Sequence, residues 1–319
     1  MRQFAALSDA TVVSTLDDSL GLLAINGIDS AKFLQGQITC NLQDITPQQS
    51  RLGAHCTHKG RMVASFRLLQ NAEHSYLFVL PKTTLAALQK SLAKYIVFSK
   101  AKLSDASGDY VLRGISGTQA QQRVAEVFGA APNASNAQHS NENGSVICIN
   151  AQTPRYLCVI PQASAAAVDS ALSASAQIAD SHYWHWLDIR DGIGSVHAET
   201  TEEFIPQMLN LQLQEGISFT KGCYTGQEIV ARMQYRGILK KAMYRIAGSG
   251  TAPAPNTAVF QDGHTQAVGH IVCAENIADE NWEALAVINH DAIAQKIALE
   301  NLSALTVLPL PYDIPVATA

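Results

Sequence analysis

Apolar and polar residues alternate in short runs along the first hundred positions. From Leu20 to Ile25 this alternation predicts a strand, and the stretches HCTHKGRMVASFRLLQ and HSYLFVLP have the same character. A turn at Lys59-Gly60 divides the first of these stretches into two strands. A helix is predicted after Pro81, because apolar residues recur there at helical spacing. These residues are Leu85, Leu88, Leu92 and Ile96. The pattern indicates an α+β sheet with helices on one face.

A short helix is expected directly after the first strand. Asp29 or Ser30 can cap its N-terminus, and Gly36 is placed to end it. Gln35 and Gln37 flank this glycine in FLQGQIT. Their amides could satisfy the donors and acceptors of a bound ring, or they could simply complete the helix end and the turn.

The pattern changes after residue 115. Segment 116–182 contains two helical stretches, TQAQQRVAEVF and ASAAAVDSALSASAQ, and two strand candidates, SVICIN and RYLCVIP, so it predicts a second small α+β unit. Between them, residues 129–145 are small, polar and rich in turn formers, which predicts a mobile loop. From residue 242 onward, short strands separated by Gly, Pro, Asn and Asp favour a small β-barrel or sandwich.

Length and composition fit this division. The 319 residues suggest two or three domains, and a hydrophobic content of 47% supplies buried cores. We therefore divide the chain into segments 1–115, 116–182, 183–241 and 242–319. The formal net charge of -5 gives no global footprint for nucleic acid or an anionic membrane, although it leaves room for a local basic patch.

The cysteine pattern, the N-terminal residues and the apolar runs indicate in which cellular compartment the protein is expected. The six cysteines are scattered without a CxxC pair, which is typical of free thiols in a reducing cytosol. The N-terminus lacks the apolar core of a signal peptide, and no run of about 18 apolar residues predicts a membrane span. We expect a cytoplasmic protein without a resident metal, since no second pair of ligands stands at zinc spacing.

The densest chemistry lies in residues 217–235, ISFTKGCYTGQEIVARMQY. We interpret ISFT as the end of a strand, KGCYTG as a turn, and the remainder as a helix with a capping box formed by Thr225 and Glu228. Cys223 would then precede a helix N-terminus and follow Lys221 by two residues, and both neighbours favour a thiolate. The alternative is a small buried cysteine beside a solvated lysine.

The same stretch, KGCYTGQEIVAR, resembles the signature of the YgfZ family. These are bacterial folate-binding proteins related to the glycine-cleavage T protein. The resemblance spans about residues 12–245 and is weaker in the C-terminal segment. Five other segments resemble the family in the same order: 27–39, 54–68, 94–100, 187–196 and 202–219.

The resemblance implies two ferredoxin-like α+β domains and a C-terminal β-barrel in a ring, with tetrahydrofolate or a derivative bound at the centre. It also implies a role in iron–sulfur cluster assembly or repair, and thereby in tRNA modification by radical-SAM methylthiotransferases. The family's lysine and cysteine correspond to Lys221 and Cys223, and a folate-contacting tryptophan corresponds to Trp184. A second family tryptophan is replaced here by Leu20, whose aliphatic face could still pack on a pterin.

Trp184 and Trp186 would share one face if YWHWLDIRDGIG (183–194) were a strand. Such an aromatic face suits a flat pterin, whereas ordinary core tryptophans are the alternative. Arg190 or Lys221 could pair with the glutamate tail of folate. For Arg190 we favour a structural ion pair.

Two other functions remain open. A folate-dependent aminomethyl or one-carbon transferase would turn over tetrahydrofolate, but a cysteine at this turn is unusual for the T-protein branch. Whether the chain catalyses any reaction is left undecided. Direct tRNA binding is disfavoured by the acidic balance, although eight basic residues could cluster. These are Lys59, Arg61, Lys94, Lys100, Arg232, Arg236, Lys240 and Lys241.

Overall fold

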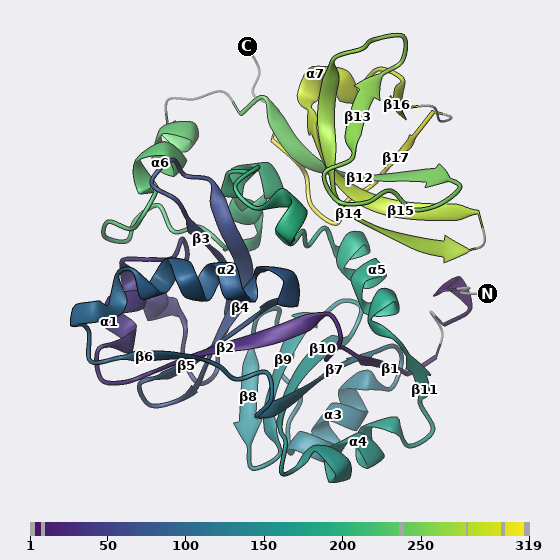
Figure 1. The fold of residues 1–319 in the computed structure, drawn as a ribbon. Coiled ribbons are helices and arrows are strands. Elements are labelled where there is room, and N and C mark those ends of the chain that lie inside the picture. Colours follow the sequence, from purple (N-terminus) through teal and green to yellow (C-terminus); the bar gives the residue numbers. More distant parts are fainter. Residues whose placement is uncertain (1–3, 8–9, 236–238, 279, 301–303, 316–319) are drawn as a thin grey trace.

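The protein is described by a computed structural model that covers residues 4–7, 10–235, 239–278, 280–300 and 304–315. The chain forms three sheets, and helix α5 of the segment between residues 181 and 235 lies between the second and the third, while α6 lies at the outer edge (Figure 1). The mixed α+β class expected from the sequence is therefore confirmed.

The first sheet is antiparallel and has the strand order β3-β4-β5-β2-β6. Its strands are β2 (Leu20–Asn26), β3 (Arg51–Cys56), β4 (Met62–Ala72), β5 (Ser75–Pro81) and β6 (Lys102–Asp105). Its helices are α1 (Ser30–Gln35), η2 (Leu42–Asp44), α2 (Lys82–Ala93) and η3 (Ile96–Phe98). The predicted strand, hairpin and helix are confirmed, and Gly36 follows α1 as its C-cap.

Both faces of this sheet are buried. Leu23 and Ile25 of β2 pack toward α1 and α2, while their neighbours Leu22 and Ala24 pack against the second sheet. Successive side chains of a strand point to opposite faces, so a strand between two layers must be apolar at nearly every position. This explains why the run LGLLAI contains no charged residue.

The second sheet has the order β11-β1-β7-β10-β9-β8, with β1 and β11 parallel and the other pairs antiparallel. Its strands are β1 (Val12–Thr15), β7 (Tyr110–Ser116), β8 (Gln138–Asn141), β9 (Gly144–Asn150), β10 (Arg155–Pro161) and β11 (Gln177–Ala179). Helices α3 (Ala120–Phe128) and α4 (Ala165–Ser173) pack on it.

Two sequence-based expectations change here. Residues 138–141 lie inside the stretch interpreted as a mobile loop, yet they form β8 and pair with β9. Polar strands at a sheet edge lack the apolar alternation that the interpretation relied on. The boundary between residues 115 and 116 falls within β7, and β1 joins the second sheet, so the first two units are interleaved along the chain.

The third sheet is antiparallel, with the order β16-β13-β14-β15-β12-β17. Its strands are β12 (Lys241–Ser249), β13 (Ala258–Gln261), β14 (Ala267–Ala278), β15 (Asn281–Asn289), β16 (Ile297–Leu299) and β17 (Thr306–Leu308). The short helix α7 (His290–Ile293) follows β15. The succession of short strands predicted after residue 242 is confirmed.

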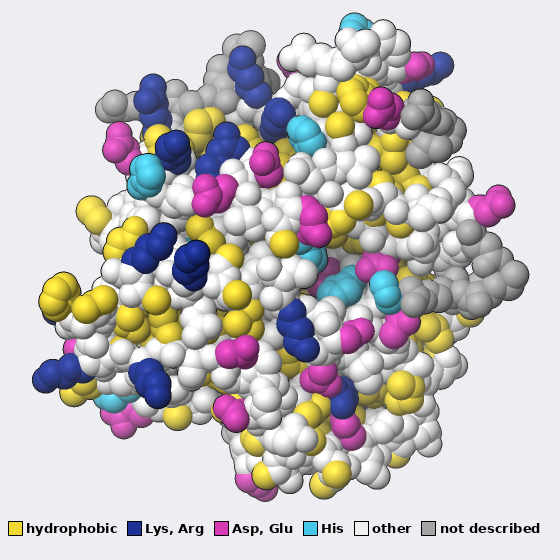
Figure 2. Space-filling view, in the orientation of Figure 1, with side chains coloured by type: hydrophobic (Ala, Val, Ile, Leu, Met, Phe, Trp, Pro, Cys, Tyr) yellow, Lys and Arg dark blue, Asp and Glu magenta, His cyan; other side chains and the backbone are white. Residues whose placement is uncertain are grey.

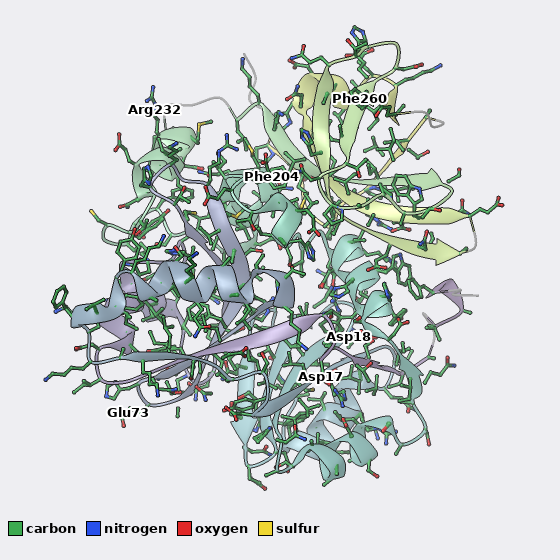
Figure 3. All side chains as sticks on the ribbon, in the orientation of Figure 1. Asp17, Asp18, Glu73, Phe204, Arg232 and Phe260 are labelled. Carbon is green, nitrogen blue, oxygen red and sulfur yellow. The ribbon has the colours of Figure 1, made fainter. Side chains whose placement is uncertain are left out.

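The segment that links these sheets is mostly helical. It contains α5 (Ser181–Asp191), η4 (Ala198–Thr200), η5 (Pro206–Leu209), η6 (Leu211–Gln214) and α6 (Gln227–Tyr235), while η1 (Phe4–Leu7) lies near the start of the chain. Phe204, labelled in Figure 3, belongs to a core in which β3, α6, β12 and β15 meet. None of the helices in the described part of the chain is long and apolar enough to cross a membrane.

One local prediction in this segment is wrong, and the condition of a second interpretation is not met. ISFT (217–220) forms no strand but an irregular connection. Residues 183–191 are helical, so Trp184 and Trp186 belong to different cores rather than to one strand face. Aromatic residues favour strands only weakly, and packing on three sides overrides that preference.

Candidate functional site

The KGCYTG loop is fastened to the loop that follows α1. Ser218 N donates to Thr39 O over 2.9 Å, and Thr39 Oγ1 donates to Gly216 O over 2.6 Å. Thr225 N donates to Gly36 O over 3.2 Å. Two segments about 180 residues apart in the chain, FLQGQIT and ISFTKGCYT, are thus joined along their backbones.

We call this contact between residues 33–40 and 216–225 the seam. Lys221 makes two of its hydrogen bonds through its side chain. Its Nζ donates to Ile38 O over 2.8 Å and to Cys40 O over 2.9 Å, and it lies 5.0 Å from the centroid of the Tyr224 ring. Burial lowers the Lys221 pKa to about 8. The ammonium is therefore directed into the 38–40 turn, and the structure gives it a positioning role that the sequence did not reveal.

Cys223 lies on the outside of the same loop. Its side chain is exposed, whereas Cys40, Cys56, Cys148 and Cys158 are buried. Helix α6 begins at Gln227, so Cys223 precedes it by four residues. The helix dipole acts mainly within the first turn, and Cys223 lies outside that turn. Accessibility is the property that distinguishes this cysteine.

The expected capping box of Thr225 and Glu228 is replaced by another contact. Thr225 Oγ1 lies 3.4 Å from Gln37 Oε1, and Gln37 O lies 2.7 Å from His55 Nδ1. Gln37 therefore belongs to the seam beside the thiol loop. Gln35 is turned elsewhere, because it bonds Asn41 Oδ1 and the Leu42 amide over 2.8 Å each. These contacts match the helix-end alternative for Gln35.

A second candidate feature is a hollow at the centre of the molecule. Leu20 and Trp184 both line it, together with Arg67 and Asp188. It has a volume of about 70 Å³ and adjoins a second hollow of about 170 Å³, and Leu20, Asp188 and Ser195 line both. The structure thus brings together Leu20 and Trp184, which lie 164 positions apart in the sequence.

Trp184 offers this hollow little surface. It is 3% exposed, and the guanidinium carbon of Arg155 lies 3.8 Å from its ring centroid. The backbone of Gly114 also packs against the ring, since a Cβ at that position would lie 2.1 Å from Trp184 Cε3. The indole therefore contributes to the wall of the hollow rather than a free stacking face.

The hollow has a charged wall that the sequence analysis missed. Asp188 accepts a 2.5 Å hydrogen bond from Arg155, and Arg155 also pairs with Asp191 over 2.8 Å. Burial is the largest influence on Asp188 and by itself would raise its pKa, but the charges and hydrogen bonds of Arg155 and His185 together lower that pKa, so the carboxylate is ionised at neutral pH. The i, i+3 spacing of Asp188 and Asp191 in LDIRDG was the available signal.

Arg67 places a cation on the same wall. It is buried, and its guanidinium donates to two neutral oxygens, Asn136 Oδ1 over 2.6 Å and Ser50 Oγ over 3.3 Å. Burial lowers the Arg67 pKa to about 10. A buried cation without a direct carboxylate partner among the described residues favours an acceptor atom in the hollow beside it.

Arg190 lies away from this hollow. It lines a separate cavity of about 590 Å³, and its guanidinium carbon lies 4.9 Å from the Trp186 ring centroid. The structural ion pair favoured for Arg190 is not among the contacts of the described residues, which give it this ring contact instead. Of the sequence-predicted residues, Lys221, Cys223 and Gln37 form one group, Leu20 and Trp184 form another, and Gln35 and Arg190 stand apart.

Comparison with known proteins assigns the family. No model of a known family matches the chain. The tRNA-modifying protein YgfZ of Yersinia enterocolitica (serotype O:8 / biotype 1B) is 36% identical over 303 residues, 93% of this chain and 91% of that protein. The glycine cleavage system aminomethyltransferase T from Bartonella henselae has a similar fold, with a TM-score of 0.75 at 14% identity over 97% of this chain and 88% of that one. Through its identity to the Yersinia protein, this chain belongs to the YgfZ family.

Proposed function

We propose that this protein is a folate-binding accessory factor that supports iron–sulfur cluster assembly or repair, and thereby tRNA modification such as methylthiolation. The observation that carries the proposal is the 36% identity, over nearly the whole chain, to a protein described as tRNA-modifying. The radical-SAM tRNA methylthiotransferases are the partners we expect, through indirect or transient contact. The ring arrangement with a closed C-terminal barrel is part of the same proposal.

The central hollow is the proposed folate site, and its residues fit a pterin. A pterin presents donors and an acceptor along one edge of a flat ring. Asp188 supplies an acceptor and Arg67 a donor, while Leu20 and the indole wall supply apolar surface. The two adjoining hollows provide the space, with the glutamate tail leaving toward solvent. When bound, the folate would supply one-carbon chemistry.

An added tryptophan in the hollow can test whether tetrahydrofolate binds there, by its fluorescence. Leu20→Trp places an indole at the position where the family carries a tryptophan, so tetrahydrofolate should quench its fluorescence in a saturable titration. Ile178→Trp, on exposed β11, is the matched control. Trp184 is common to both variants, so the signal compared is the quenching in excess of that of wild type, and Ile178→Trp should show none. An absence of saturable quenching in Leu20→Trp would overturn the folate assignment.

Cys223 is the proposed reactive group, because it is the exposed thiol on a loop fixed from below by Lys221. In a strain that lacks the factor, Cys223→Ala should fail to restore methylthiolated tRNA at normal protein level. Tyr235→Ala, an exposed change on neighbouring α6, should restore it. Full rescue by Cys223→Ala would show that the thiol is dispensable.

The one-carbon transferase alternative makes a separable prediction. A transferase would form methylene-tetrahydrofolate from tetrahydrofolate and an aminated one-carbon donor, with release of ammonia, at a rate above the uncatalysed background. We expect no such turnover. A measured turnover would replace the accessory role while leaving the folate site intact.

A further inference from the structure

A concave groove lies on the outside of the first sheet, away from the central hollow. It has a volume of about 450 Å³ and runs between the β3–β4 turn and the C-terminal half of α2. The β3–β4 turn contributes Lys59, and α2 with the residues after it contributes Lys90, Lys94 and Tyr95. Figure 2 shows that Lys and Arg side chains are frequent over the part of the surface formed by α2 and α6.

The charge of this groove is positive. Lys90 and Lys94 stand at i and i+4 and therefore share one face of α2, opposite Lys59. All three are exposed, and within the described residues none of them forms an ion pair. Among the described residues that line the groove, Glu202 is the one carboxylate, and the hydroxyl residues Ser91 and Thr201 line it too. The acidic total charge of the chain thus conceals a local basic site.

Exposed rings extend from the groove. Tyr95 is 51% exposed and Phe98 is 99% exposed, with Val97 between them at 71%. Lys100 follows two residues after Phe98 and is also exposed. Large apolar side chains held in solvent beside unpaired cations are typical of surfaces that bind another molecule. Nucleobases stack on such rings while the backbone phosphates meet the lysines.

We infer that this basic–aromatic surface, formed by Lys59, Lys90, Lys94, Tyr95, Phe98 and Lys100, binds a single-stranded segment of nucleic acid, and that its natural occupant is the loop of a structured RNA. The positive charge and the exposed rings are the observations that favour nucleic acid as the ligand. The choice of RNA over DNA rests on the proposed function. A groove lined by lysines and hydroxyls on two walls suits a strand better than it suits a flat lipid surface.

The test is fluorescence anisotropy of a short labelled RNA stem–loop with the full chain at about 50 mM salt, repeated at higher salt. The logarithm of the association constant should fall linearly as the logarithm of the salt concentration rises. The double variant Lys90→Glu, Lys94→Glu should reduce affinity by at least about tenfold, and it should flatten this slope by about 0.7 per lost phosphate contact. Lys296→Glu, a surface reversal in the connection before β16, matches the charge change of a single lysine reversal, and it should change affinity much less than Lys90→Glu or Lys94→Glu alone.

Phe98→Ala separates stacking from charge. It should weaken binding by about tenfold while leaving the salt slope unchanged, because base–aromatic stacking does not release counterions. An RNA duplex without a loop should bind more weakly than the stem–loop. Equal affinity for the duplex, or an unchanged affinity in Phe98→Ala, would overturn the single-strand assignment.

Other occupants give distinct results. If no RNA binds at low salt, or if Lys296→Glu loses as much RNA affinity as Lys90→Glu or Lys94→Glu, the proposed RNA-binding surface is wrong. Tighter binding to DNA of the same sequence overturns RNA as occupant. Sedimentation with phosphatidylserine vesicles, lost in Phe98→Ala, would assign a membrane instead. Tetrahydrofolate quenching of Leu20→Trp should be unaffected by Lys90→Glu and Lys94→Glu, so either conclusion can fail without the other.

Discussion

Two backbone carbonyl oxygens, of Ile38 and Cys40, hold the ammonium of Lys221. A sequence cannot show this arrangement, because backbone carbonyls exist at every position and only the fold decides which lie within reach. Lys221 therefore connects the KGCYTG loop to the turn after α1, and its ammonium is hydrogen-bonded within that turn. Cys223 is presented by this connection and remains exposed.

The buried state of Lys221 predicts a pH dependence of stability. Burial lowers its pKa in the folded protein to about 8, whereas an unfolded chain titrates near about 10.4. Between these values the unfolded state binds more protons at this residue, so stability rises with pH there. The free energy of unfolding of wild type relative to Lys221→Met should thus increase from about pH 8 to about pH 10 and be constant below. Urea denaturation across this range measures the difference, and a flat difference would show that Lys221 keeps its proton when folded.

Helix α6 docks on the β3–β4 turn through two glycines with positive φ. Gly226 has φ +84, and a Cβ there would lie 2.5 Å from Thr57 O. Gly60, on the turn, has φ +70, and its Cβ would lie 2.8 Å from Ile229 Cβ. Gly226 and Gly60 therefore permit the start of α6 to approach the β3–β4 turn. The other glycine of KGCYTG, Gly222, takes no part in this contact.

The two glycines of this motif should therefore respond differently to one added methyl group. Gly226→Ala should lower the free energy of unfolding by about 1–3 kcal/mol, since it combines an unfavourable φ with a backbone clash. Gly222→Ala is the matched control: a Cβ there meets no atom within 4 Å, and the change should stay within about 0.5 kcal/mol. Thermal or urea unfolding checks both. Equal effects would contradict the docking explanation.

At the scale of the whole molecule, Asn210 joins the linking segment to the third sheet. Its Nδ2 donates to Met243 O over 2.8 Å, and its Oδ1 accepts from Met243 N over 3.4 Å. Met243 pairs with Val287 of β15 on one side, while β17 covers β12 only from Arg245 to Ala247. The side-chain amide thus replaces a neighbouring strand at an otherwise open edge.

Removing this amide should loosen the third sheet from the rest of the chain. Asn210→Gly keeps the positive φ of 56 accessible but leaves both polar groups of Met243 without partners, at about 1–3 kcal/mol for each buried group. Hydrogen exchange at the Met243 amide should accelerate together with the loss of stability. Asn256→Gly, with φ 69 and an exposed amide that donates to Glu199 O, is the matched control and should have a small effect. Unchanged exchange at Met243 would contradict the role of Asn210.

The elements that could be predicted from the sequence are those in which one physical signal dominates. Helix α2 was predicted because one buried face imposes a helical period on the sequence, and Gly36 marked the end of α1. Strand β2 was predicted at the right residues, although burial of both its faces makes it apolar throughout rather than alternating. Strand β8 was not predicted, because a polar edge strand carries no period, and α5 was not predicted, because its aromatic residues are also common in strands. The KGCYTG loop was located correctly, but its partners were not, since they lie about 180 residues away.

The sequence by itself determined the α+β class, most elements of the three sheets, and the two segments that carry the candidate chemistry. These depend on local periodicity and on residue types that a chain displays directly. Only the tertiary structure decided that Lys221 faces carbonyl oxygens, that Trp184 is covered by Arg155, and that three lysines line one groove. Such contacts join residues far apart in the chain, and their geometry follows from packing the whole molecule rather than from any local pattern.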